Sequence, residues 1–389
     1  MPLTLPALLF AFAHTALAQS IPTPPDVHGL RAGEHAHAFG AGTTVGNAVV
    51  ATSDGGWLAV GYTTAGEFGG EDVYVVRTDR AGSVRWTKTI GGAGDDSGWA
   101  VARTAPDGFV IVGFTVNFGA DGEDVLVISI GDDGKTRWTK TIGGPGNQRA
   151  WAMSRAPEGG FYLAAQTDRG PGGALDACVI RIDATGTARW TKTFGGAGTD
   201  RLFGIVMAAD GGPTAAGLSS ASPGAPTDAY IAHLTPAGVV QWERRHGGPA
   251  DDLAHAVATT ADGGYLLTGY GQSQGAGGND VYLMKCAADG SLLWTRTAGS
   301  AGDDRGMMSV PQSRGFVTIG YQRKPDRDWE MWIGTFDDAG RLISERVAGG
   351  PLDDRAVMAS SAANGDFVVT GALGRDGGAS ALLLMWLRT

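Results

Sequence analysis

The sequence is poor in cysteine, in basic residues and in long apolar runs. Its 389 residues include only Cys178 and Cys286, and 30 basic side chains stand against 40 acidic ones, a formal net charge of −10. Two cysteines cannot form a disulfide scaffold or, alone, a structural zinc site. An acidic chain without a basic stripe does not suit nucleic acid. After residue 18 no apolar run is long enough to span a membrane.

The first residues have the pattern of a signal peptide. Residues 8–18 are apolar and uncharged, and Ala16-Leu17-Ala18 fits a small-x-small cleavage site. We therefore predict a signal peptide over residues 1–18, cleavage after Ala18, and export to the periplasm or the exterior. The proline-rich residues 19–33 are predicted to form a flexible lead-in, and residues 34–389 a single domain.

Glycine dominates the composition and restricts the fold class. With 64 glycines and 17 prolines, the chain breaks helices too often for a helical domain. The 43% of hydrophobic residues and the 11 tryptophans argue against disorder. What remains is a fold of many short strands joined by tight turns.

An internal repeat gives this fold an architecture. Five tryptophans follow one another at a constant spacing of 52 residues: Trp86, Trp138, Trp190, Trp242 and Trp294. One unit contains four predicted strands, at residues 99–104, 109–115, 125–130 and 137–142. Asp-Gly pairs such as Asp133-Gly134 supply the positive φ angles that hairpin turns need. Four antiparallel strands per repeat are the signature of a β-propeller blade.

The number of strands predicts how the ring closes. Seven first strands are recognisable, but only six fourth strands, because the chain stops just after a third strand. Residues 34–39, immediately before the first unit, can supply the missing strand. We therefore predict an all-β, seven-bladed β-propeller with four antiparallel strands per blade, closed by an N-terminal strand that completes the last blade.

Opposite charges recur at fixed positions of the third and fourth strands. If each hairpin is folded symmetrically about its turn, these charges face each other as cross-strand pairs. The predicted pairs are Asp72–Lys88, Asp124–Lys140, Asp176–Lys192, Asp228–Arg244, Asp280–Arg296 and Glu330–Arg346. In the last unit Ser380 and His37 occupy the two positions, so both members change together, as closure by an N-terminal strand requires.

Three sequence features carry a resemblance to known proteins. They are the Asp-Gly-Gly type of turn, the third-strand aspartate in residues 71–74 (EDVY), and residues 82–86 (GSVRW) followed by Gly91-Gly92. The chain resembles the glycine-rich, seven-bladed propellers of secreted bacterial repeat proteins. Residues 82–92 also resemble the tryptophan-docking stretch of pyrroloquinoline-quinone enzymes and of outer-membrane assembly scaffolds. The propellers of those families have eight blades, whereas this chain has seven units. The quinone enzymes also use a vicinal cysteine pair that is absent here. The resemblance therefore implies the fold and no quinone cofactor.

Acidic residues cluster in the loops between fourth and first strands, where an arginine often follows. The residues are Asp95, Asp96, Asp200, Asp251, Asp252, Asp303, Asp304, Asp353 and Asp354, with Arg201, Arg305 and Arg355. Strand parity puts these loops on the same face as the glycine-rich loops between second and third strands. One interpretation is a site for a cation such as calcium, which prefers oxygen ligands. The alternative is that each aspartate caps loop backbone N–H groups or pairs with an arginine of a neighbouring unit.

Two units depart from the repeat. In the sixth, charged residues that include Lys324 and Arg327 precede Trp329, and this combination suits a sugar ring or a protein hot spot; the alternative is a solvated loop with Trp329 packed on its own blade. In the fifth, His246 and His255 flank an acidic pair. They could bind a metal or act in acid–base chemistry, or they could be packed histidines bonded to backbone.

Together these features define a candidate ligand site on a loop-rich, acidic face. Its residues are Trp329, Arg327, Lys324, Asp251, Asp252, His255, Asp304, Arg305, Asp354 and Arg355. We expect a monomeric, non-catalytic binding or scaffold module for a protein or carbohydrate ligand, without a cofactor and without an assigned catalytic residue. One alternative is a glycan hydrolase or lyase that uses acids at the channel mouth. The other is a surface protein stabilised by calcium.

Overall fold

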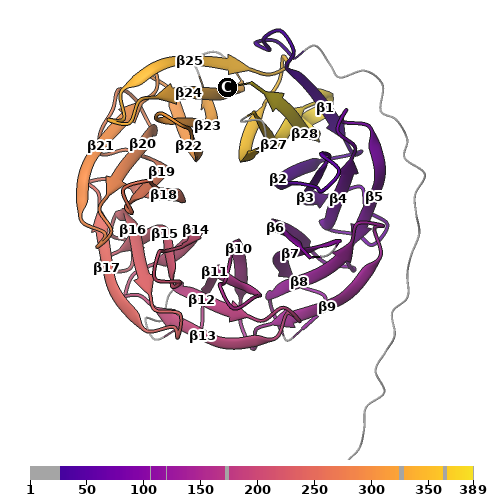
Figure 1. Cartoon of the computed structure of the whole chain (residues 1–389), viewed down its shortest axis with the longest axis horizontal. Coiled ribbons are helices and arrows are strands. Elements are labelled where there is room, and N and C mark those ends of the chain that lie inside the picture. The colour runs from indigo at the N-terminus through magenta and orange to yellow at the C-terminus, as the bar shows by residue number, and fades with distance from the viewer. Residues whose placement is uncertain are drawn as a thin grey trace, which may run out of the picture.

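The computed structural model describes residues 27–105, 107–119, 121–170, 175–323, 328–361 and 366–388. In this part of the chain, 28 strands form seven four-stranded sheets. The sheets stand like blades around a central channel, with the first strand of each blade innermost and the fourth outermost (Figure 1). The predicted seven-bladed β-propeller is confirmed. Among the described residues, no helix is long and apolar enough to cross a membrane.

Each of the first six blades uses four consecutive strands. Blade 1 contains β2 (Thr44–Ala51), β3 (Trp57–Thr63), β4 (Asp72–Thr78) and β5 (Val84–Ile90); blade 2 contains β6 (Asp96–Thr104), β7 (Gly108–Thr115), β8 (Asp124–Gly131) and β9 (Thr136–Ile142). Blade 3 contains β10 (Gln148–Arg155), β11 (Phe161–Thr167), β12 (Asp176–Ile182) and β13 (Ala188–Phe194); blade 4 contains β14 (Asp200–Met207), β15 (Pro213–Ser220), β16 (Thr227–Leu234) and β17 (Val240–His246). Blade 5 contains β18 (Asp252–Thr259), β19 (Tyr265–Gly271), β20 (Asp280–Cys286) and β21 (Leu292–Ala298); blade 6 contains β22 (Asp303–Pro311), β23 (Phe316–Arg323), β24 (Trp329–Phe336) and β25 (Leu342–Ala348).

Blade 7 combines the two ends of the chain. Its strands are β26 (Arg355–Ser361), β27 (Phe367–Gly374), β28 (Ser380–Leu387) and the N-terminal β1 (His35–Phe39). β1 runs antiparallel to β28, with Ala38 opposite Leu383. This is the predicted closure, and it leaves no open edge between blades. The preceding residues, expected to be a flexible lead-in, touch blade 6, where His28 and Gly349 exchange two backbone hydrogen bonds.

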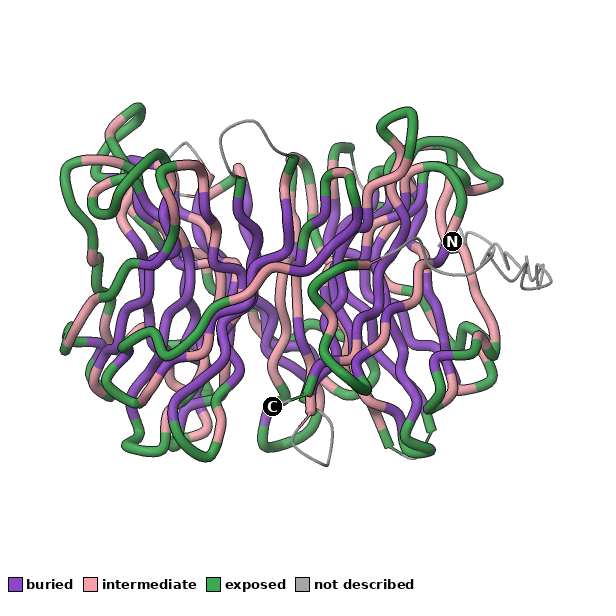
Figure 2. Tube along the Cα trace, turned by 90° about the horizontal axis from the view of Figure 1, so that it is seen from above, coloured by how far each residue is buried: buried purple, intermediate pink, exposed green. Residues whose placement is uncertain are grey.

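The core lies between the blades. Seven buried apolar clusters are present, one at each interface between neighbouring blades. At the interface of blades 1 and 2, for example, Val60 packs with Ile111 and Ile128. The inner three strands of a blade supply this core, and the outer strand is more exposed (Figure 2). Cys178 in blade 3 and Cys286 in blade 5 are both buried free thiols.

The repeated tryptophans fasten each outer strand to the next blade. The indole Nε1 of Trp86 donates a hydrogen bond to the carbonyl oxygen of Asp132, at 2.8 Å, in the last turn of blade 2. The same ring lies against Gly134, which has φ of 78° and where a Cβ would come within 3.1 Å of the indole. Glycine is therefore required there for both the turn and the close approach.

The predicted register of the charge pairs is wrong. Val75 lies opposite Lys88, and Asp72 lies beside Gly91, three positions away from the predicted alignment. The cause is the turn at residues 79–83, which contains Gly82 at φ 85°, together with a β-bulge at the end of β4. The basic partners therefore face apolar residues: Lys88–Val75, Lys140–Val127, Lys192–Val179, Arg244–Ile231, Arg296–Leu283 and Arg346–Ile333. In blade 7, His37 lies opposite Leu384 and not Ser380.

Several of these bases act between blades instead. The Nζ of Lys88 donates to the carbonyl oxygen of Gly134 at 3.0 Å. The Nζ of Lys140 donates to Oγ1 of Thr187 at 2.7 Å. Thus a charge pattern that suggested pairing within a hairpin belongs partly to the contacts that hold neighbouring blades together.

Candidate functional site

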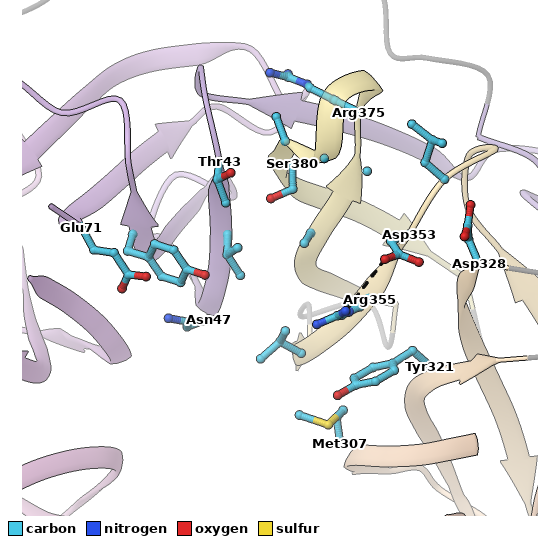
Figure 3. A pocket seen from close by; sticks show the side chains of 18 of the residues that line it. Thr43, Asn47, Glu71, Met307, Tyr321, Asp328, Asp353, Arg355, Arg375 and Ser380 are labelled. Atoms are coloured by element: carbon cyan, nitrogen blue, oxygen red, sulfur yellow. Dashed lines mark ion pairs between the residues drawn. The ribbon is translucent and has the colours of Figure 1, made fainter. Parts of the chain in front are cut away.

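The loops named by the sequence meet at one end of the channel. Loops between fourth and first strands and loops between second and third strands lie at the same end of the channel, as strand parity predicted. We call this opening the channel mouth. It contains a cavity of about 730 Å³, the mouth cavity, lined by residues of several blades that include Glu71, Arg149, Tyr321 and Arg355. In Figure 3, Glu71 and Asn47 lie across the open space from Arg355 and Tyr321.

A ring of bulged residues lies on the innermost strands, below the mouth. Every first strand has a β-bulge at the same place, and the extra residue of each bulge is left unpaired. These residues, which we call the channel girdle, are Asn47, Trp99, Trp151, Phe203, His255, Met307 and Val357. One arc of the girdle is aromatic, with ring centroids 4.5 Å apart for Trp99–Trp151 and 5.7 Å apart for Phe203–His255.

His255 belongs to this girdle and is held in one orientation. Its Nδ1 lies 3.2 Å from the carbonyl oxygen of Met307, which can only accept, so Nδ1 carries the proton and Nε2 is an acceptor. Burial lowers the pKa of His255 to about 4, and the ring is neutral at pH 7. Its sequence partner His246 lies on the outer strand β17 and donates to the carbonyl oxygen of Gly290.

The two histidines therefore do not share a ligand. Each bonds to a backbone carbonyl of the next blade, which is the packed arrangement considered as the alternative. Over the described ranges, no three His, Cys, Asp or Glu side chains are grouped closely enough to hold a metal ion.

The second aspartate of each acidic loop caps its own loop. Asp96, for example, accepts the backbone N–H of Gly92 at 2.8 Å. The same contact, four residues back along the chain, is made by Asp200, Asp252, Asp304 and Asp354. Asp252, Asp304 and Asp354 are buried, and the structure places these three residues of the predicted ligand site in loop-capping contacts.

The first aspartate of the loop binds the preceding blade. Asp95 accepts the backbone N–H of Glu71 at 2.9 Å, and Asp353 accepts that of Trp329 at 2.9 Å. Asp251 and Asp303 make the equivalent contact with Thr227 and Asn279. The repeated acids of the mouth are thus committed to backbone N–H groups, as the structural alternative expected.

Burial makes several of these carboxylates hard to ionise. It raises the pKa of Asp354 to about 6, and it raises the pKa of Asp72, which lies beside the next loop, to about 6 as well. Burial also raises the pKa of Asp96 and of Asp304. The Asp96 and Asp72 carboxylates come close at Gly91, where a Cβ would lie 1.8 Å from one and 3.0 Å from the other.

The predicted residues that do meet at the mouth are Trp329, Arg305 and Arg355. The Cζ atoms of Arg305 and Arg355 lie 5.5 and 5.8 Å from the centroid of the Trp329 ring, and the Tyr321 ring packs against Trp329 with centroids 5.1 Å apart. Arg355 and Tyr321 line the mouth cavity, and the Trp329 ring contacts both of them. Lys324 and Arg327 lie outside the described residues. Trp332 is a core residue, 2% exposed, and its Nε1 donates to Glu345.

Two further arginines lie at the mouth: Arg149, which the sequence analysis missed, and Arg201, which it noted beside the loop acids but left out of the ligand site. Arg149 and Arg201 occupy, in blades 3 and 4, the place that Arg305 and Arg355 have in blades 6 and 7, two residues before the bulge. We call these four residues the mouth arginines. Arg149 is ion-paired with Glu123 and lies over the Phe114 ring, with its Cζ 4.2 Å from the centroid. The signal was available, because Arg149 and Arg201 are 52 residues apart.

Comparison with known proteins finds similarity at the level of the fold. No family model matches the chain, and no curated protein matches it. A protein of unknown function from Dyadobacter fermentans is 12% identical, with a TM-score of 0.51 over 94% of this chain and 100% of its own. BBS1N, solved in complex with ARL6DN, is 10% identical, with a TM-score of 0.51 over 90% of this chain and 94% of its own.

Puromycin hydrolase is 16% identical, with a TM-score of 0.54 over 87% of this chain. The match covers 51% of the hydrolase, so the present chain spans about half its length. At these identities the likeness shows the fold alone. The matched proteins include a hydrolase and a protein solved with a partner, and the common element is the propeller.

Proposed function

We propose that this chain is a non-catalytic binding module that takes up a protein or glycan ligand in the mouth cavity. The observation that carries the proposal is the cluster of Arg305, Tyr321, Trp329 and Arg355 beside a cavity of about 730 Å³. Aromatic rings with stacked guanidinium groups are the side chains most often found at binding hot spots. A concave site at the end of a propeller channel is also a usual place for a ligand.

The carboxylates of the mouth support binding over hydrolysis. A glycosidase needs two carboxylates that face the same bond, one of them as acid. The loop acids of this mouth are occupied by backbone N–H groups, as Asp95 is by Glu71 and Asp353 by Trp329. Asp353 also lies 4.0 Å from Arg355. The repeated acids thus maintain the loops, and they leave ligand recognition to the arginines and aromatic rings.

One residue favours the second candidate, a glycan hydrolase or lyase. Glu71 lines the mouth cavity, and burial together with the nearby Asp95 raises its pKa. A carboxyl group with a raised pKa in a cavity can act as a general acid. Turnover of a bound glycan that is lost in Glu71→Gln, with binding retained, would select this function over simple binding.

The binding proposal is tested with a glycan array and a peptide library probed with the wild-type chain and with Arg355→Ala. Arg341→Ala is the matched control, since Arg341 is an exposed arginine at the turn before β25, at the opposite end of the blade. We expect ligands that lose at least tenfold in affinity with Arg355→Ala and are unaffected by Arg341→Ala. Ligands that bind all three proteins equally would place binding elsewhere and reject the mouth as the site.

Export is part of the proposal. It is supported by the apolar, uncharged residues 8–18 and the small-x-small site that ends at Ala18. Fractionation of expressing cells, with N-terminal sequencing of the exported protein, tests it. A mature chain that begins at Gln19 is expected, and an uncleaved protein retained in the cytoplasm would contradict it.

A further inference from the structure

We propose that the ligand of the mouth cavity is an acidic oligosaccharide whose uronate carboxylates bind the mouth arginines. This inference rests on the binding function proposed above and adds the chemical class of the ligand. It is carried by three observations: the position of four arginines, the neutral residue at the repeat position that faces three of them, and the character of the surface beneath them.

The mouth arginines lie at one level of the channel, where Arg149 and Arg355 line the mouth cavity and Arg201 and Arg305 are outside its lining. Each is two residues before the bulge of its first strand, so Arg149, Arg201, Arg305 and Arg355 project from equivalent positions of blades 3, 4, 6 and 7. Arg149 acts on the charge of Arg201: burial first, and then the Arg149 guanidinium, lower the pKa of Arg201. A ring of like charges around an opening favours ligands of the opposite sign.

Of the four mouth arginines, only Arg149 has an acid 26 residues earlier, at the position just before the third strand of the preceding blade. The Arg149 guanidinium pairs with Glu123, which lies 26 residues earlier, just before the third strand of the preceding blade. The residues at this position opposite the other three arginines are neutral: Leu175 for Arg201, Asn279 for Arg305 and Trp329 for Arg355. The positions 26 residues before Arg201, Arg305 and Arg355 therefore hold a neutral residue where the position before Arg149 holds an acid.

Arg201 is the least neutralised of the four. Among the described residues it has no ion-pair partner, and its buried Nε has no hydrogen-bond partner. The acid that begins the neighbouring loops, Asp95 or Asp303, is here Thr199, whose backbone N–H is bound by Ser220. A guanidinium with an unused donor beside a second guanidinium is a strong point of attraction for a carboxylate.

Acids also line the mouth cavity: Glu71, Asp328, Asp353 and Asp376 accompany Arg149, Arg355 and Arg375. Asp353 lies 4.0 Å from Arg355, and Asp303 interacts with Arg305 and Arg323. Glu71 lies across the cavity and acts on Arg149. Asp353 and Asp303 are each also bound to a backbone N–H, so these acids are fixed in the loops and leave guanidinium edges for a ligand.

Stacking on aromatic rings holds two of the arginines ready for a carboxylate. The Cζ of Arg305 lies 4.8 Å from the centroid of the Tyr270 ring, and that of Arg355 lies 5.8 Å from the centroids of Tyr321 and Trp329. A guanidinium placed over a ring keeps the N–H donors of its edge for a planar, bidentate partner. Because these groups are already ordered, they lose little entropy when a ligand binds.

The surface below the arginines suits a sugar better than an acidic peptide. The girdle rings of Trp99 and Trp151 offer faces on which pyranose C–H groups can stack. The neutral Nε2 of His255 is an acceptor for a sugar hydroxyl. A uronate carries its carboxylate directly on a rigid ring, whereas a glutamate side chain must be ordered at an entropic cost. The cavity of about 730 Å³ has the size of a short oligosaccharide site.

The test is calorimetric titration with tetrasaccharides prepared from pectate, alginate and glucuronan, each as the free acid and as the methyl ester. Neutral galactotetraose and hexaglutamate are the controls for sugar and for charge. We expect at least one free acid to bind, its methyl ester to bind at least tenfold more weakly, and its affinity to fall in high salt. Equal binding of acid and ester, or tighter binding of hexaglutamate than of every saccharide, would overturn the inference.

Variants at Arg201 make the test specific. Arg201→Gln should weaken binding of the preferred acid at least tenfold, and Arg201→Lys should give an intermediate loss, because it keeps the charge but not the fork of donors. Arg341→Gln should have no effect, and thermal melting of each variant verifies that it folds. Unchanged binding by folded Arg201→Gln would overturn the inference.

Failure of the inference can be distinguished from failure of the proposed function. If a neutral saccharide or a peptide binds and depends on Arg355, the mouth is a binding site and the acidic class is wrong. If no saccharide or peptide binds in a manner that depends on Arg355, both are rejected.

Discussion

The imidazole of His35 stacks on the indole of Trp386, with ring centroids 4.5 Å apart and planes 13° apart. The two residues lie at opposite ends of the chain and close the ring. Glu34 adds an ion pair with Arg346 of blade 6 at 2.7 Å. The N-terminal strand therefore binds both the last strand of the chain and the neighbouring blade.

Removal of this strand is expected to destabilise the ring. A variant without residues 19–40 loses five paired positions of β1, the buried Phe39 and the ion pair of Glu34. Burial of one phenylalanine alone contributes roughly 2–3 kcal/mol, so we expect a Tm lower by about 5 °C or more. A variant without residues 19–26 keeps all three contacts and should melt within about 1 °C of the wild type. Equal losses in the two variants would contradict closure by β1.

The ion pair of Glu34 with Arg346 is the reference in a test of the observed hairpin register. In a double-mutant cycle, Glu34→Gln and Arg346→Gln should couple, because their side chains meet at 2.7 Å and Glu34 is buried. Asp72→Asn and Lys88→Gln should be additive, since Lys88 lies opposite Val75 and reaches Gly134. Free energies of unfolding from urea titration give both coupling terms. Coupling of Asp72 with Lys88 would support the symmetric hairpin register predicted from the sequence and contradict the observed one.

Two aspartates are expected to show opposite pH dependence. Burial raises the pKa of Asp72 to about 6 in the folded chain, so the folded state binds the proton more tightly than the unfolded state does. The stabilisation that results from this tighter proton binding is present below about pH 4 and is lost as pH rises through 6. Asp72→Asn should therefore stabilise the protein at pH 8, by up to about 3 kcal/mol at 1.4 kcal/mol per pKa unit, and should have little effect at pH 4.

Asp262 is the matched control for this prediction. Hydrogen bonds from Thr260 and Lys285 lower its pKa, so its contribution is present above the unfolded pKa and is lost as pH falls through the folded value. Asp262→Asn should therefore destabilise the protein at pH 8. Urea titrations at pH 4, 6 and 8 measure both variants. The same sign for both at pH 8 would contradict the assigned environments.

Chelation tests the calcium alternative. The loop acids accept backbone N–H groups, as Asp96 does from Gly92 and Asp95 from Glu71, and these contacts hold the loops without an ion. We predict that Tm of the purified protein changes by less than about 1 °C in excess chelator. A large decrease, reversed by added calcium, would show that the loops need the ion.

The sequence was sufficient to predict the fold because the repeat is regular at the residues that join neighbouring blades. The constant spacing of Trp86 and its counterparts reflects one contact, an indole on the glycine turn of the next blade. The missing fourth strand predicted the place of β1. The hairpin register was not predictable in the same way, because it depends on a bulge at the end of β4 that shifts the pairing without any change in the charge pattern.

The site was predictable only in part for a related reason. Arg305, Arg355 and Trp329 were recognised because they depart from the repeat or follow its acids. Arg149 was overlooked, and Arg201 was left out of the predicted site, because their role depends on the residue 26 positions earlier, in another blade. The acids were overvalued, since an aspartate that caps a loop, such as Asp304, has the same sequence context as one that faces a ligand.

The position of a bound uronate tetrasaccharide in a crystal of the complex tests the account most directly. We predict that it lies in the mouth cavity, with a carboxylate within hydrogen-bond distance of Arg201 or Arg355 and a sugar ring against the channel girdle. A saccharide bound on the outer strands, or in the mouth with its carboxylates directed to solvent, would contradict the account.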